Sequence, residues 1–298
     1  MTTAEYTVRQ RRIDWYPAAG SLPGSADRPA LPLGRNVVHD SRNLAYRHQR
    51  TTPALVTVLH PRNAPILDQG DVGSCTGNGE VGCLACEPVF AALPKGTTLN
   101  EALALKVYSG AESIDGDGPY PPNDYGSSGP SAAKAAMKLG LIAGYTHCLS
   151  LEDVLDALQA SAVSIGINWY DSFDSPPASG LLTISPGAQV RGGHEPMLRG
   201  VDTEARTVFG DNSWGTSWGV AGSFTMSWDT LARLLAEDGD GTVSVPLSAP
   251  APVPVPPAPD ADAALWASVR GWTAARHVGS NRAAATAVRA WAQHKGFR

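Results

Sequence analysis

Residues 68–78 place one cysteine, Cys75, behind a glycine-rich turn and six residues after a glutamine, Gln69. The residues that follow, 79–86, can continue as a helix, which would put Cys75 at a helix N-terminus. The positive end of the helix dipole and the free N–H groups of the first turn favour the thiolate there, and the thiolate is the nucleophilic form. A lone cysteine is more often a small buried residue, so this stretch alone leaves both interpretations open.

Two downstream motifs favour the nucleophile. Residues 192–196 read Gly-Gly-His-Glu-Pro, and residues 211–219 read Asp-Asn-Ser-Trp-Gly-Thr-Ser-Trp-Gly. A cysteine, a histidine and an asparagine in this order are distant in sequence and meet only in the fold. Over residues 60–230 the sequence resembles the papain (C1) family of cysteine peptidases. The residues around the cysteine are most similar to those of bacterial and phage-type members.

The resemblance implies a role for each motif residue. Cys75 is the nucleophile, and His194 takes its proton to form a thiolate–imidazolium pair and then protonates the leaving amine. Asn212 orients the imidazole without adding charge. Gln69 and the backbone N–H of Cys75 donate to the developing oxyanion. Trp214 shields the His–Asn hydrogen bond from water.

Substrate-binding positions are implied less sharply. Gly126 and Ser127 lie where family members hydrogen-bond substrate backbone, although a helix-capping turn explains them equally well. Gly193 and Glu195 flank the histidine and belong to the cleft wall. Glu195 and Thr76 depart from the residues usual in the family, so specificity does not transfer. Glu195 either favours a basic substrate residue or points to water.

Periodicity predicts an α+β protein, with helices first and antiparallel strands second. The expected helices cover 99–109, 130–140 and 150–158, and the expected strands cover 163–167, 195–201, 207–211 and 222–227. The resemblance implies a papain-like two-lobed fold, in which a helical lobe carries the cysteine and an antiparallel barrel-like sheet lobe carries the histidine and asparagine.

Composition excludes several other classes. The 298 residues are 43% hydrophobic and 17% charged, which suits a globular core. A net charge of −5 argues against general nucleic-acid binding. No stretch reaches transmembrane length, and the N-terminus lacks the apolar run of a signal peptide. We therefore expect no membrane partner and cytoplasmic synthesis, with virion association or release on lysis left open.

The remaining cysteines invite a metal interpretation. Cys83 and Cys86 form a C-x-x-C pair, and Cys148 follows His147. Structural zinc sites usually show two well-spaced pairs. We therefore expect these thiols to pack in the core, and we expect no metal and no cofactor.

Four segments are expected. Residues 1–58 form an extended N-terminal arm, packed or partner-facing, with a short inhibitory strap as the alternative. Residues 59–245 form the peptidase domain. Residues 246–260 form a proline-rich linker in an extended conformation, and residues 261–298 form a helical hairpin.

The hairpin tail needs a docking surface, because forty residues cannot form a stable core alone. From residue 260 onward the chain carries six basic and two acidic residues. This basic tail suits an acidic surface on its own domain, on another copy or on a larger assembly such as a phage particle.

Together these features predict a cysteine peptidase that hydrolyses peptide bonds of a peptide or protein substrate through an acyl-enzyme. Two alternatives remain. One is a peptidoglycan-cleaving thiol hydrolase, as in lysins. The other is a structural or virion component that keeps the papain-like fold.

Overall fold

The computed structural model describes residues 31–37, 41–52 and 54–249. The predicted hairpin at 261–298 and nearly all of the proline-rich linker lie outside these residues. So does the first half of the predicted N-terminal arm.

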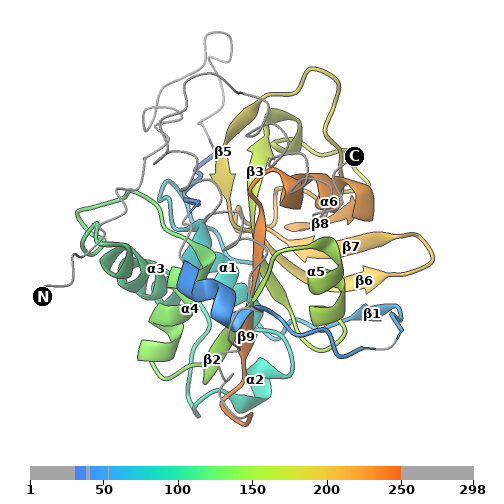
Figure 1. Ribbon diagram of the computed structural model, residues 1–298. Helices are drawn as coiled ribbons and strands as arrows, with labels where there is room; N and C mark the ends of the chain where they lie inside the picture. Colours follow the sequence, from blue (N-terminus) through green and yellow to red (C-terminus); the bar gives the residue numbers. More distant parts are fainter. Residues whose placement is uncertain (1–30, 38–40, 53, 250–298) are drawn as a thin grey trace, which may run out of the picture. The chain divides into compact units, whose positions relative to one another are not determined.

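The helices gather mainly on one side of the sheet (Figure 1). The α-helices are α1 (Cys75–Leu84), α2 (Val89–Ala92), α3 (Glu101–Asp115), α4 (Gly129–Lys138), α5 (Leu151–Ala157) and α6 (Trp228–Ala236), and the 3-10 helices are η1 (Ser41–Tyr46) and η2 (Asp171–Phe173). Asn100, Ser128 and Ser150 cap α3, α4 and α5 through side-chain oxygens. These three predicted helices are confirmed, and Ser150 accepts from the Asp153 backbone as its capping motif indicates.

The strands join in the order β2-β9-β3-β6-β7-β8-β4, with β1 added to β6 and β5 to β3. They are β1 (Val58–Leu59), β2 (Gly144–Cys148), β3 (Val163–Tyr170), β4 (Leu181–Leu182), β5 (Val190–His194), β6 (Met197–Asp202), β7 (Thr207–Asp211), β8 (Ser223–Ser227) and β9 (Asp240–Val245). Pairing is antiparallel except between β4 and β8, which are parallel. The sheet is therefore mixed, where the sequence predicted antiparallel strands.

Two hydrophobic clusters form separate cores. One lies among α1, α3 and α4 and includes Leu84, Val107 and Ala136. The other lies under the sheet, α5 and α6 and includes Trp169 and Leu231. The chain thus has a helical lobe and a sheet lobe, as the α+β pattern predicts.

Helix α1 lies between these two cores, and all ten of its residues are buried. Its glycines permit close packing on both sides. A side chain at Gly77 would meet the backbone oxygen of Ala104 and the Tyr108 side chain on α3. One at Gly79 would lie 2.7 Å from the backbone oxygen of Glu195 in the sheet lobe. The first residue of α1, Cys75, is thereby fixed where the lobes meet.

Sequence periodicity missed several elements, among them β2, β5, β9 and α6. Strand β9 lies in a part of the sheet that is covered on both faces. Residues on both of its faces are therefore buried, including polar ones such as Thr242 and Ser244. Among the described residues, no helix is long and apolar enough to cross a membrane.

Candidate active site

Cys75 begins α1 and is fully buried. The preceding residue, Ser74, makes no side-chain cap; its hydroxyl instead donates to Asn78 at 2.9 Å. The backbone amides of Glu195, Gly34 and Thr76 lie close to the Cys75 sulfur and lower its pKa, against the effect of burial. Because Glu195 directly follows His194, the thiol lies beside the histidine-bearing strand.

His194 is the last residue of β5 and pairs in register with Ile167 of β3. Its Nε2 lies 2.7 Å from Oδ1 of Asn212, the residue that follows β7. The other ring nitrogen, Nδ1, is buried and has no hydrogen-bond partner among the described residues. The asparagine therefore fixes the imidazole and leaves one nitrogen available.

Two tryptophans cover this imidazole. Trp214 stacks on His194 with ring centroids 4.7 Å apart, and Trp169 meets the same ring edge-on at 4.7 Å. Both indoles are buried. They keep water away from the His194–Asn212 hydrogen bond, and a low local dielectric strengthens such a bond. Sequence reasoning identified Trp214 and missed Trp169.

Asp211 and Asn212 are neighbours with separate partners. Oδ2 of Asp211 accepts from Arg199 at 3.0 Å and from Arg62 at 3.2 Å. Its Oδ1 accepts from Ser223 at 2.7 Å. Of the two residues, the structure directs the neutral amide to His194 and the carboxylate to two arginines.

The Gln69 side chain is anchored at both ends of its amide. Its oxygen accepts from the Ser213 hydroxyl at 2.6 Å, and its nitrogen donates to the backbone oxygen of Val72 at 2.8 Å. Its backbone N–H donates to the Ser213 carbonyl at 2.9 Å. The side-chain nitrogen carries a second N–H, so one donor is left beside the turn that leads to Cys75.

Burial governs the charge state of the thiol and the imidazole. Burial raises the pKa of Cys75 to about 12, and the charge of Glu195 adds to the effect. Burial lowers the pKa of His194 to about 4, although the hydrogen bond to Asn212 acts to raise it. Both groups are therefore neutral near pH 7 in this structure, and not the thiolate–imidazolium pair expected from the sequence.

The N-terminal segment, residues 31–37, lies beside the thiol, since the Gly34 amide is close to the Cys75 sulfur. It passes between the helical lobe and β5 (Figure 1, dark blue). The N–H groups of Gly34 and Arg35 donate to the Gly193 carbonyl at 3.2 and 3.0 Å. On the other side, Ser127 donates to Gly34 at 2.8 Å and accepts from Asn36 at 2.6 Å.

Glycines on three sides permit this close approach. A side chain at Gly73, Gly126 or Gly193 would meet backbone atoms of residues 33–35. Gly126 also has a φ of 78°, a conformation that favours glycine. The structure thus brings Gly126, Ser127 and Gly193 together around a peptide backbone, which here belongs to the chain itself. The adjacent Ser128 caps α4, so the capping interpretation of this corner also holds.

Glu195 points into the protein and not to water. Its Oε1 accepts from the Ser164 hydroxyl at 3.0 Å, and its Oε2 is buried without a partner among the described residues. Burial and the nearby charge of Asp240 raise its pKa to about 8, and the Arg35 charge opposes them. Of the alternatives that the sequence left open, exposure to solvent is therefore wrong.

Sequence reasoning missed Arg35 and Asp240, which lie beside Glu195. Their side chains form an ion pair at 2.6 Å. Arg35 belongs to a segment rich in proline and glycine, and Asp240 begins the undetected strand β9. No pattern in the sequence connects residues 205 positions apart.

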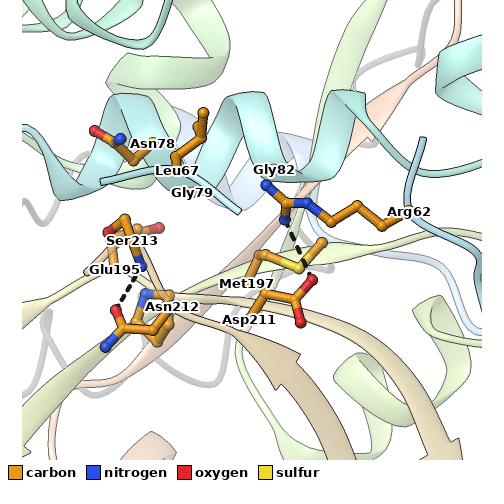
Figure 2. Close-up of a pocket in the computed structure, with 11 residues that line it drawn as sticks. Arg62, Leu67, Asn78, Gly79, Gly82, Glu195, Met197, Asp211, Asn212 and Ser213 are labelled. Carbon is orange, nitrogen blue, oxygen red and sulfur yellow. Dashed lines mark hydrogen bonds and ion pairs between the residues drawn. The ribbon is translucent and has the colours of Figure 1, made fainter. Parts of the chain in front are cut away.

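A small pocket lies between α1 and strands β6 and β7 (Figure 2). Its lining is Arg62, Leu67, Asn78, Gly79, Gly82, Glu195, Pro196, Met197, Asp211, Asn212 and Ser213. The Arg62–Asp211 ion pair closes one end, and neither Cys75 nor His194 lines it. The pocket is therefore internal packing space behind the candidate site.

The C-x-x-C pair lies in a small cluster with Ala162 and Met197. Cys83 and Cys86 are both buried free thiols. Within the described ranges, no group of three or more metal-binding side chains comes together. These thiols pack between α1 and β6, as the sequence predicts.

No protein-family model and no curated protein matches the chain. Solved structures do. Xylellain, a cysteine protease from Xylella fastidiosa, is 18% identical over 72% of this chain and 96% of that chain, with a TM-score of 0.57. Digestive procathepsin L 3 of Tenebrio molitor larval midgut is 15% identical over 72% of this chain and 76% of that chain, with a TM-score of 0.52. The chain therefore has the fold of the papain-like cysteine proteases.

Proposed function

We propose that this protein is a cysteine peptidase in which Cys75, His194 and Asn212 act together. One observation carries the proposal. His194 is held by Asn212 through Nε2 at 2.7 Å, keeps Nδ1 unpaired, and directly precedes the residue whose N–H reaches the Cys75 thiol. A nucleophile at a helix N-terminus, a base and an orienting group are the parts of thiol catalysis.

The proposed reaction has two steps. Nδ1 of His194 takes the Cys75 proton, and the sulfur attacks the carbonyl carbon of the scissile bond. The C–N bond breaks as the imidazolium returns the proton to the leaving amine, which leaves a thioester. Water, deprotonated by the imidazole, then attacks the thioester and releases the acid and the thiol. Asn212 keeps the ring in place and stays neutral throughout.

Gln69 supplies the oxyanion donor in this proposal. Its amide is fixed by Ser213 and Val72, so the remaining N–H is preorganised. The backbone N–H of Cys75 is the second donor, because the first N–H groups of a helix have no partner within it. Loss of one such donor typically lowers the rate by about 10²–10³.

Substrate binding requires the 31–37 segment to leave. It occupies the backbone partners Ser127 and Gly193, and its Gly34 amide lies beside the Cys75 thiol. We therefore propose that the structure represents a covered resting state, the inhibitory alternative for the N-terminal arm.

Hydrolysis assays test the proposed function. Purified full-length protein is incubated with casein or with peptidoglycan, and new amino termini are measured. Casein cleavage that is lost in Cys75→Ala and kept in Cys83→Ala supports the peptidase. Cleavage of peptidoglycan alone favours the lysin-like alternative, and no cleavage of either, even after release of the segment, favours a scaffold.

A further inference from the structure

The side chain of Arg35 is buried in a pocket of the sheet lobe. Only 2% of it is exposed, and its Nη2 lies 2.6 Å from Oδ1 of Asp240 and 2.8 Å from the carbonyl of Asp238. Arginine is almost never fully buried unless it is paired. The pocket therefore provides a specific environment for a cation.

Two carboxyl groups form the end of this pocket. A side chain at Gly166 of β3 would meet Nε of Arg35, Oδ1 of Asp240 and Oε2 of Glu195, so all three groups surround one point. Glycine at this position leaves the space that the guanidinium fills. The nearby His147, 3.7 Å from Asp240, has a pKa lowered by burial and adds no charge near pH 7.

The two carboxyl groups belong to the protein body, and the arginine does not. Asp240 begins β9, and Glu195 connects β5 to β6. Arg35 comes from the 31–37 segment. When this segment leaves, the pocket keeps the half-buried carboxylate of Asp240 and the buried carboxyl group of Glu195 without their cation, and an acidic group that is withdrawn from water and unpaired is costly. A replacement cation from a bound peptide would restore the pairing.

The backbone of Arg35 is held in the way that a bound peptide would be. Its neighbour Gly34 faces the Cys75 sulfur, and Gly193 and Ser127 bind the backbone from either side. The arginine side chain thus enters the protein one residue away from the residue at the thiol. A substrate residue next to the scissile position would reach the same pocket.

We propose that Asp240 and Glu195 form a specificity pocket for a basic side chain of the substrate, and that Arg35 is its resident occupant. This proposal rests on the proposed peptidase function. It names the substrate class, which is peptides that carry arginine or lysine next to the residue at the scissile bond.

The first experiment measures kcat/KM of the full-length protein on fluorogenic peptides. In one series the residue before the scissile residue is Arg, Lys, Leu or Glu, in a second series the residue after it is varied in the same way, and all other positions are fixed. We expect a preference for Arg and Lys over Leu of about tenfold or more, which corresponds to one charged hydrogen bond. Asp240→Asn should lower the kcat/KM of the Arg and Lys peptides relative to that of the Leu peptide, so that most of this preference is lost.

Matched variants separate selectivity from general damage. Glu204→Gln neutralises an exposed carboxylate in the turn after β6 and should keep the preference. Arg35→Leu should raise turnover of every peptide, because it removes the resident cation, and Arg35→Lys should do so less. A protein without any preference for basic residues, or an Asp240→Asn variant that loses Arg and Leu peptides equally while its melting temperature is unchanged, would overturn the proposal.

A second experiment does not depend on hydrolysis. Full-length Arg35→Leu is mixed with a synthetic peptide of residues 31–37, or with the same peptide carrying leucine for arginine, and alkylation of Cys75 is followed. We expect protection by the arginine peptide alone, and its loss in the Arg35→Leu/Asp240→Asn double variant. Protection without hydrolysis of any substrate would uphold the pocket and refute the peptidase. Equal protection by both peptides would refute the pocket.

Discussion

Nε2 of His194 and Oδ1 of Asn212 lie 2.7 Å apart, although His194 ends strand β5 and Asn212 follows strand β7. Oδ1 of Asn212 also accepts from the backbone N–H of Ser213 at 2.8 Å. The amide is therefore fixed before it binds the imidazole, and it fixes the ring in turn. An orienting group held in this way determines which ring nitrogen faces the thiol.

Replacing Asn212 by alanine should lower kcat far more than it raises KM. The imidazole loses its fixed orientation, and misplacement of a catalytic group by 1 Å costs about 10² in rate. Stopped assays on a small peptide give both constants. Asn123→Ala, in an exposed loop, is the control and should retain full activity. A variant at position 212 with unchanged kcat would contradict the proposed orienting role.

Cys75→Ala should abolish hydrolysis, whereas Cys83→Ala and Cys86→Ala should retain it. The last two thiols lie in an apolar cluster, and burial raises the pKa of both. Their loss leaves only a small cavity, with a stability cost of about 1 kcal/mol per lost group. Mass spectrometry after treatment with a substrate-like thiol reagent should find the label at Cys75. Labelling at Cys83 would refute the assignment.

Local sequence predicted several elements of the candidate site, because their constraints are local. A cysteine that starts a helix, and the Ser150 capping motif, depend on neighbours a few residues away. The strand at 207–211 was predicted with its exact bounds because its alternating residues reflect one buried face. Helices α4 and α5 were found within two residues for the same reason, whereas α3 continues six residues beyond its predicted end.

The occupied site could not be predicted in this way. Arg35 meets Asp240 only through tertiary packing, and the Gly34 contacts with Ser127 and Gly193 are made by backbone groups that any residue carries. The neutral state of Cys75 and His194 follows from their complete burial in the assembled protein. The charge state of Cys75 thus depends on the assembled site. Its position at a helix N-terminus, taken alone, indicated a thiolate and not the neutral thiol.

Glu80 should make the stability of the protein depend on pH. It is buried in α1 and accepts from the Ser244 hydroxyl at 2.6 Å, and burial raises its pKa from 4.5 to about 7. The folded chain therefore binds this proton more tightly than the unfolded chain does. The Glu80 contribution to the free energy of unfolding is complete below pH 4.5 and is lost as the pH rises through about 7.

Glu80→Gln removes this titrating proton. It should therefore remove the Glu80 contribution to the pH dependence of the free energy of unfolding. Between pH 5 and pH 8, we expect the free energy of unfolding of the variant to rise relative to that of the wild type, by up to about 3 kcal/mol for a pKa shift of this size. Urea unfolding at both pH values measures the difference, and Glu204→Gln, which is exposed, is the control. A difference between variant and wild type that is equal at pH 5 and pH 8 would show that Glu80 is not the cause.

Gly34→Ala should uncover the active site. A methyl group at this position would overlap the carbonyl of Gly73, and backbone at that point cannot move aside cheaply. The 31–37 segment should therefore leave, with loss of its hydrogen bonds to Ser127 and Gly193. Water then reaches the thiol, and the pKa of Cys75 should fall from about 12 toward its ordinary value.

Iodoacetamide labelling of Cys75 as a function of pH measures this change. Near pH 7 the wild type should react slowly, and Gly34→Ala should react at least about tenfold faster, since one pKa unit changes the thiolate fraction tenfold. Gly187→Ala is the control for general backbone strain, because the added methyl group meets no atom within 4 Å but the φ of +82° disfavours alanine; its Cys75 should be labelled as slowly as that of the wild type. If Gly34→Ala stays folded and its thiol remains as unreactive as that of the wild type, the segment does not protect Cys75, and its burial must come from the two lobes alone.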